Sequence, residues 1–198
     1  MSLVRFPLEQ YASLELNQVG FSKTGMVVSQ TPLGTYFTKA NPCENGMWVS
    51  ADKSKGVIAP LANAQDVGPV GIVYTTEKEY DSNHYGLKTF GRKIAGDYPR
   101  IGIMDRGDTV TTNCLQYDDS EFKAVPATDD DAAKTSVQVL FEALEKHEIT
   151  PVYVAPVYGS AVPKLTLNKP ASGIYGKVTK FYTVPNGERG VKYQIVSL

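Results

Sequence analysis

The chain is poor in cysteine: Cys43 and Cys114 are its only two among 198 residues. Disulfide frameworks are typical of small secreted domains with a much higher density of cysteine. A chain of this length also buries enough surface to form a core without covalent cross-links. We therefore predict two free thiols; the alternative is a bond across neighbouring strands.

Neither sign of charge is in excess. The chain has 20 Lys and Arg residues, 21 Asp and Glu residues and a net charge of -1. Binding of DNA or RNA depends on clustered basic side chains that neutralise phosphates. The composition therefore predicts that nucleic acid is not a partner.

Long apolar runs are missing too. No segment reaches the roughly 20 apolar residues that span a bilayer, and Arg5, Pro7, Glu9 and Gln10 interrupt the first apolar residues, unlike a signal peptide. We expect no membrane partner. The protein should fold in the host cytoplasm, where it can join a particle assembled there.

The sequence lacks the common catalytic motifs, including the nucleophile elbow, the zinc-protease motif and glycine-rich phosphate loops. His84 and His147 have no partner at metal-ligand spacing. Asp129, Asp130 and Asp131 are consecutive, and side chains about 100° apart on a helix cannot converge on one ion. We therefore expect no enzyme, no catalytic residue, no metal site and no cofactor.

Short apolar segments bounded by turn residues dominate what is present. Residues 47–49, 70–74 and 101–104 are each too short for a helix and rich in β-formers. Gly and Pro punctuate them. The pattern predicts a mainly β fold, a small antiparallel β-barrel or sandwich, with a further short strand at 122–125.

One packed helix is predicted at residues 129–147. Thr128 with Asp131 approximates a capping box, and Lys146 and His147 suit the negative end of the helix dipole. The helix has one apolar stripe, which we expect to pack on the sheet: Ala133, Val137, Leu140, Phe141 and Leu144.

A C-terminal β-hairpin is predicted beyond this helix. Residues 175–184 should pair with 191–196 around a turn that contains Pro185-Asn186-Gly187.

Three parts are expected along the chain. Residues 1–25 form an N-terminal arm, because their apolar residues follow no strict period and Pro7 discourages a long helix. An ordinary first strand in the core is the alternative. Residues 26–126 form the barrel, and residues 127–198 form a lobe of helix and strands that is separate or continuous with it.

Five short segments follow one another as strands and turns: NGMWV at 45–49, GVIAP at 56–60, VGIV at 70–73, RIGI at 100–103 and RGDTV at 106–110. This succession resembles the capsid decoration, or cement, proteins of tailed bacteriophages over about residues 26–115. The resemblance implies a small β-barrel on the capsid surface of a virion. It also implies a non-enzymatic role, with the major capsid protein as partner, stabilised capsomer junctions and self-association, for example as a trimer.

Within this interpretation the arm is the candidate capsid-binding site. It has more apolar residues than a free tail keeps comfortably in water, namely Leu3, Val4, Phe6, Leu8 and Tyr11. We expect Phe6 and Leu8 to bury their side chains on the capsid protein while the backbone adds a strand to an exposed edge.

Other functions stay open. The chain is otherwise another virion structural protein, such as a head fibre base or tail-tube subunit. From a different class, a carbohydrate-binding β domain needs clustered exposed aromatic residues, whereas the single Trp48 lies in an apolar strand and should be buried. Arg106-Gly107-Asp108 matches the tripeptide that integrins bind, but it also suits an ordinary turn with Gly107 at its centre.

Overall fold

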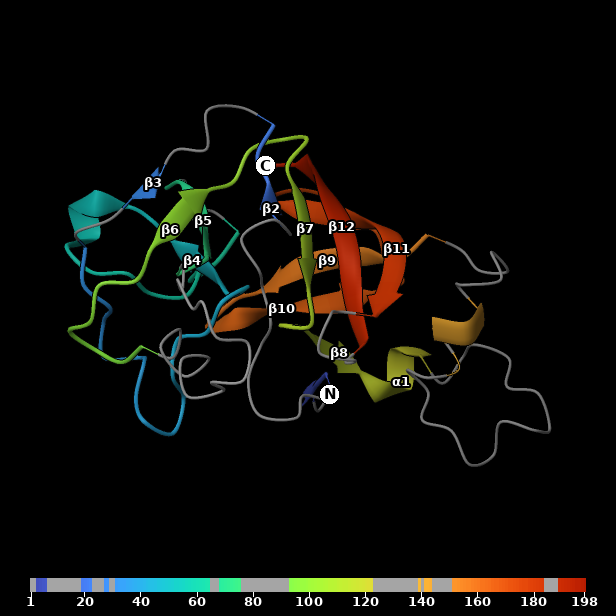
Figure 1. The fold of residues 1–198 in the computed structure, drawn as a ribbon, viewed down its shortest axis with the longest axis horizontal. Helices are drawn as coiled ribbons and strands as arrows, with labels where there is room; N and C mark the ends of the chain where they lie inside the picture. Colours follow the sequence, from blue (N-terminus) through green and yellow to red (C-terminus); the bar gives the residue numbers. More distant parts are fainter. Residues whose placement is uncertain are drawn as a thin grey trace, which may run out of the picture.

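The computed structural model describes residues 3–6, 19–22, 27–28, 31–64, 68–75, 93–122, 139, 141–143, 151–183 and 189–198. The fold is mainly β, as predicted (Figure 1). Its strands are β1 (Leu3–Arg5), β2 (Val19–Gly20), β3 (Val27–Val28), β4 (Trp48–Ser50), β5 (Val70–Val73), β6 (Ile101–Ile103), β7 (Thr109–Thr112), β8 (Gln116–Asp118), β9 (Tyr153–Val157), β10 (Ser160–Thr166), β11 (Tyr175–Thr183) and β12 (Arg189–Ser197). Two short helical segments are η2 (Lys53–Lys55) and α1 (Asp119–Phe122).

The larger sheet has eight strands in the order β1-β8-β10-β9-β11-β12-β7-β2. All its pairs are antiparallel except β10 with β8. β7 and β8 lie near opposite ends of this order, yet residues 113–115 alone connect them. Such a connection spans at most about 14 Å, so the sheet must curl until its two ends approach. The result is a barrel-like sheet.

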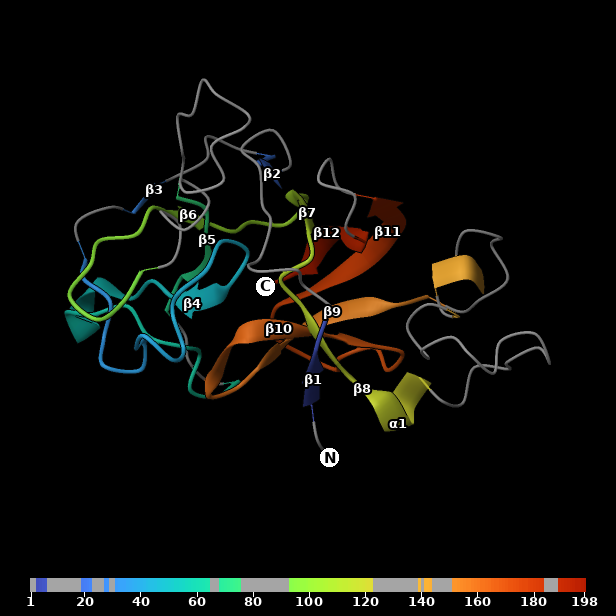
Figure 2. The same ribbon diagram turned by 60° about the horizontal axis from the view of Figure 1, so that its bottom comes forward.

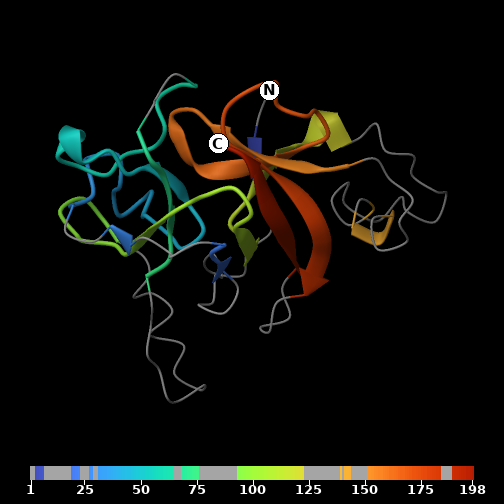
Figure 3. The ribbon, with the colours of Figure 1, turned by 90° about the horizontal axis from the view of Figure 1, so that it is seen from above.

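The smaller sheet has the order β3-β6-β5-β4, and all its pairs are antiparallel. It lies on one side of the barrel, while the β11–β12 hairpin lies on the other (Figure 3). A buried hydrogen bond joins the two sheets: the indole Nε1 of Trp48 donates to the hydroxyl of Tyr193 at 3.0 Å. Neither ring is exposed, so the two sheets share one core.

The predicted C-terminal hairpin is confirmed. β11 pairs with β12 from Tyr175 opposite Ser197 to Thr183 opposite Arg189, with a register shift between Val178 and Lys180. Val191, Tyr193 and Ile195 are fully buried and alternate with more exposed residues, as a strand with one core face requires. The predicted turn lies outside the described residues.

The predicted helix is described only in part. Val139 and residues 141–143 are helical, and the rest of the predicted span lies outside the described residues. Phe141 is 1% exposed, and its ring packs edge-on against Phe6 and Phe181. The described part of the apolar stripe therefore does face the sheet.

The described strands of the expected barrel and of the expected lobe share one sheet, as in the alternative that the lobe is continuous with the barrel. β7 and β8 precede the expected boundary at Pro126, and β9 to β12 follow it, yet all six strands belong to one sheet. The described parts of the expected arm, β1 and β2, are the edge strands of that same sheet. The alternative that an ordinary first strand starts the chain describes β1 better than a separate arm does.

Candidate functional site

The end of the eight-stranded sheet formed by β1 is the candidate site. β1 pairs with β8 in the register Leu3 opposite Asp118, Val4 opposite Tyr117 and Arg5 opposite Gln116. Figure 2 shows β1 beside β8 near the N-terminus. In the part of the chain that the structure describes, no strand pairs with the other side of β1.

The ladder determines which backbone groups remain open. The backbone N–H of Phe6 donates to the carbonyl of Leu115 at 2.9 Å. In an antiparallel pair, the backbone N–H and C=O groups of successive residues point alternately toward the partner strand and away from it. The peptide groups of Val4 and Phe6 therefore point toward β8. The peptide groups of Leu3 and Arg5 therefore point away from β8, where an added strand would meet them.

The side chains of β1 point alternately to the two faces of the sheet. Phe6 is 2% exposed and packs against the rings of Tyr117 and Phe141. Val4 lies on the same face of the strand but is 39% exposed, because it sits where the sheet ends. Leu3 is half-buried.

The expectation for the capsid-binding residues changes accordingly. The side chain of Phe6 lies in the protein's own core, so the docking contact that we expected of Phe6 would need this side chain to leave the core. Val4 and Leu3 keep accessible surface. Leu8 and Tyr11 lie outside the described residues.

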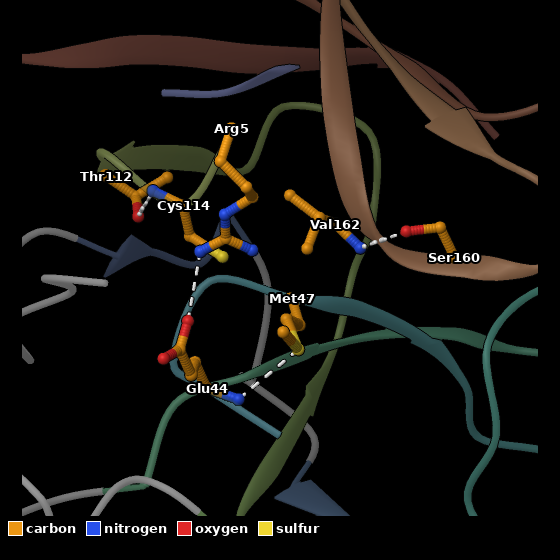
Figure 4. Close-up of polar contacts among 7 residues, drawn as sticks. All are labelled: Arg5, Glu44, Met47, Thr112, Cys114, Ser160 and Val162. Carbon is orange, nitrogen blue, oxygen red and sulfur yellow. Dashed lines mark hydrogen bonds and ion pairs between the residues drawn. The ribbon is translucent and has the colours of Figure 1, made fainter. Parts of the chain in front are cut away.

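An ion pair ties β1 to the loop that leads into β4. The guanidinium Nη2 of Arg5 lies 3.0 Å from Oε2 of Glu44, and the two side chains are 36% and 10% exposed (Figure 4). The backbone N–H of Glu44 donates to the sulfur of Met47 at 3.3 Å, which fixes the turn that holds the carboxylate. A half-exposed pair contributes at most about 1 kcal/mol, so its main effect is to position β1.

Gly46 explains why this loop reaches the barrel. Its φ of 91° is a conformation that other residues rarely adopt. A Cβ atom at this position would also lie 2.6 Å from Cβ of Cys114 and 2.7 Å from Oγ1 of Thr112. The close approach of the loop to the β7–β8 connection therefore requires glycine.

The two thiols beside this contact, Cys43 and Cys114, are unreactive in the folded protein. Cys43 and Cys114 are free and fully buried, which agrees with the prediction. Burial raises the pKa of the Cys114 thiol to about 12, and it raises the pKa of Cys43 even further. Reactive cysteines need a lowered pKa and access to solvent, so neither residue suits nucleophilic or redox chemistry in the folded protein.

Asp108, the acidic residue of the integrin-like tripeptide, has a structural role. It is 1% exposed, and its carboxylate accepts hydrogen bonds from the backbone and hydroxyl of Ser22 and from the backbone of Asp105, at 2.6, 2.9 and 2.7 Å. Gly107 supplies the turn with a φ of 99°. A carboxylate engaged in this way is not presented to a receptor.

The remaining candidates are aromatic, histidine and aspartate residues. Trp48 is 1% exposed and unavailable to a sugar, while Tyr98 and Tyr158 are exposed. His84, His147 and the three aspartates at 129–131 lie outside the described residues. Across the described ranges, no group of His, Cys, Asp or Glu is arranged to hold a metal ion, and no helix is long and apolar enough to cross a membrane.

Sequence reasoning missed a basic surface on the hairpin. Lys177, Lys180 and Lys192 are all exposed, and Lys180 lies directly opposite Lys192. The signal was present in the sequence as an uneven distribution of charge, which the net charge of the whole chain hides.

Comparisons with known proteins give no further information on the site. A scan against protein-family models found no match, and searches of the curated proteins and of the solved structures found none either.

Proposed function

We propose that this protein is a non-enzymatic structural component of a phage virion. In this role it binds the outer surface of the capsid, contacts the major capsid protein and stabilises the junctions between capsomers. Self-association, for example as a trimer, belongs to the same proposal. The resemblance of residues 26–115 to capsid decoration proteins motivates it, and the edge formed by β1 is the observation in the structure that supports it.

The β1 edge has the two features that strand addition needs. The peptide groups of Leu3 and Arg5 point outward and give a neighbouring chain hydrogen-bonding partners. Beside them, the side chain of Val4 is 39% exposed and gives that chain an apolar contact. Soluble proteins usually protect such an edge with charge, proline or a covering loop.

A ligand that binds only the assembled lattice stabilises the lattice by mass action. A protein bound across capsomer junctions should therefore raise the temperature at which particles burst. This effect requires only binding and no chemical reaction. It is therefore compatible with the two unreactive thiols and with the structural role of Asp108.

The test is titration against DNA-free shells of the major capsid protein that is encoded alongside this protein. Val4→Lys places a charge on the edge while its methylene stem preserves the local packing, and it should weaken shell binding about tenfold or more. Val57→Lys is the matched control, because Val57 is also 39% exposed but lies between η2 and β5, outside the eight-stranded sheet. Equal binding by the two variants and the unmodified protein would exclude the β1 edge as the contact.

A glycan panel, run in parallel, separates the carbohydrate-binding alternative. The burial of Trp48 argues against that alternative. Saturable binding to a glycan, together with no affinity for shells, would overturn the capsid proposal.

A further inference from the structure

The outer face of the β11–β12 hairpin concentrates positive charge. Lys180 and Lys192 are direct partners across the two strands, and Lys177 precedes them on β11. All three are exposed, whereas Phe181 and Val191, on the other face, are buried. Cβ atoms of directly opposite residues lie about 4.5–5.5 Å apart. The two lysine side chains therefore leave the backbone at neighbouring points on one face of the hairpin, which places two positive charges on that face.

The C-terminal segment, residues 151–198, has a net positive charge as a whole. Residues 151–198 contain six of the chain's 20 Lys and Arg residues but only one of its 21 Asp and Glu residues, Glu188. Residues 118–148 contain nine acidic and three basic residues, and the remainder of the chain is balanced. The near-neutral whole therefore contains a strongly basic part, which is the footprint expected of a site for anions.

Two tyrosine rings lie on the same face as the lysines. Tyr153 of β9 is the direct cross-strand partner of Lys177, so their side chains project from the same side of the sheet. The ring of Tyr175 lies 5.9 Å from that of Tyr153, edge to face. Both tyrosines are half-buried, so each keeps accessible surface on the face that carries Lys177. β11 and β12 lie at the front of the barrel, with β9 and β10 behind them (Figure 1).

We propose that this face binds single-stranded nucleic acid without sequence preference. Lysines supply charge along the phosphate backbone, and tyrosine rings supply surfaces on which bases stack; proteins that hold single strands use this combination. A duplex keeps its bases stacked inside and cannot use the rings. An acidic protein surface would use the lysines but gain nothing from the tyrosines, so the neighbouring rings favour a nucleic acid. The inference does not depend on the capsid proposal.

The strength of binding should follow counterion release. For a single strand, the slope of log K against log salt is about -0.7 for each phosphate neutralised, so three lysines give roughly -2. Raising the salt from about 50 mM to about 200 mM should then weaken binding roughly twentyfold.

The experiment measures fluorescence anisotropy of labelled oligothymidylate of about 20 nucleotides with the full chain. The triple variant Lys177→Gln, Lys180→Gln, Lys192→Gln should bind at least tenfold more weakly at low salt and lose most of the slope. The control variant Lys39→Gln, Lys55→Gln, Arg100→Gln removes the same charge from exposed positions outside residues 151–198 and should bind like the unmodified protein. Thermal melting by circular dichroism verifies that each variant is folded.

Tyr153→Leu tests the second half of the proposal, because it keeps an apolar side chain but removes the ring. Affinity for oligothymidylate should fall about fivefold or more, since stacking of one base on an aromatic ring contributes at least that much. The salt slope should not change. Affinity for poly-L-glutamate, a probe without bases, should be weak and insensitive to this substitution.

Three results would overturn the proposal. The first is no binding of oligothymidylate at low salt. The second is an equal loss of binding in the control triple variant. The third is binding of poly-L-glutamate or of duplex DNA as strong as that of the single strand, which would assign the face to an acidic protein surface or to phosphates alone.

Discussion

Phe6→Ala is the substitution that most directly tests whether the N-terminus belongs to the fold. The ring is 2% exposed, and burying a phenylalanine contributes about 2–3 kcal/mol. Its edge-on contacts with Tyr117 and Phe141 add about 0.5–1.5 kcal/mol each. The substitution should therefore lower the free energy of unfolding by about 3–5 kcal/mol, the range typical of a phenylalanine removed from a core.

Urea denaturation, followed by tryptophan fluorescence, measures this quantity. Trp48 is the chain's only tryptophan and lies in the same core cluster as Phe6. Val4→Ala, on the same strand at 39% exposure, is the control and should cost about 1 kcal/mol or less. If both variants unfold at the urea concentration of the unmodified protein, the segment is an independent arm and the packing argument is wrong.

Three further predictions concern buried polar groups. Asp108→Asn replaces one carboxylate oxygen by an N–H donor that faces other donors, and should cost about 2 kcal/mol in urea denaturation; an unchanged midpoint would contradict the hydrogen bonds to Ser22 and Asp105. Tyr193→Phe leaves the indole N–H of Trp48 without an acceptor and should cost about 1–3 kcal/mol, whereas Tyr98→Phe, at 62% exposure, should change nothing. The pKa of an unperturbed cysteine thiol is 9.0, and burial raises the pKa of both thiols well above this value in the folded protein. Above pH 9 the thiols ionise in the unfolded chain but not in the folded protein. The free energy of unfolding is therefore retained below pH 9 and falls above it, by about 1 kcal/mol for each thiol at pH 10. Cys114→Ala should reduce this loss between pH 8 and pH 10, and an equal loss in the variant would contradict the role of burial.

The parts of the fold that were predictable are those where one strand carries its own signal. β12 alternates buried and exposed residues around a core face, and its partner β11 directly precedes the predicted turn in the sequence. Local patterns of this kind need no knowledge of distant segments. The same applies to β5 and β6, which are short apolar runs that each contain one glycine.

The segment around Phe122 shows where local rules compete. Of the strand expected at residues 122–125, only Phe122 is described, and it is the last residue of α1 rather than part of a strand. Asp118 accepts hydrogen bonds from the backbone and hydroxyl of Ser120, which also lower the pKa of Asp118. An acidic residue bonded in this way starts a helical turn, and this capping signal accounts for the helical conformation of residues 119–122.

The pairing of β1 was not predictable from the sequence for a different reason. Apolar residues without a strict period and without turns suggested a segment lacking a partner within the chain. Its partner is β8, more than 100 residues away, and the Arg5–Glu44 pair joins it to a second distant segment. Pairing across such distances leaves no periodic trace in a single sequence, so the strand could be recognised but its partner could not.

The position of β1 also decides what the protein can offer a partner. Phe6 in the core and Arg5 in its ion pair hold the strand in register, and this register points the peptide groups of Leu3 and Arg5 outward. A free arm would have to lose the entropy of ordering each residue when it binds, at about 1–2 kcal/mol per backbone residue. A strand already held by its own fold has lost that entropy on folding, so less of the binding energy is spent on ordering. Under the capsid proposal, the burial of Phe6 therefore makes the β1 edge a better docking surface than a flexible tail would be.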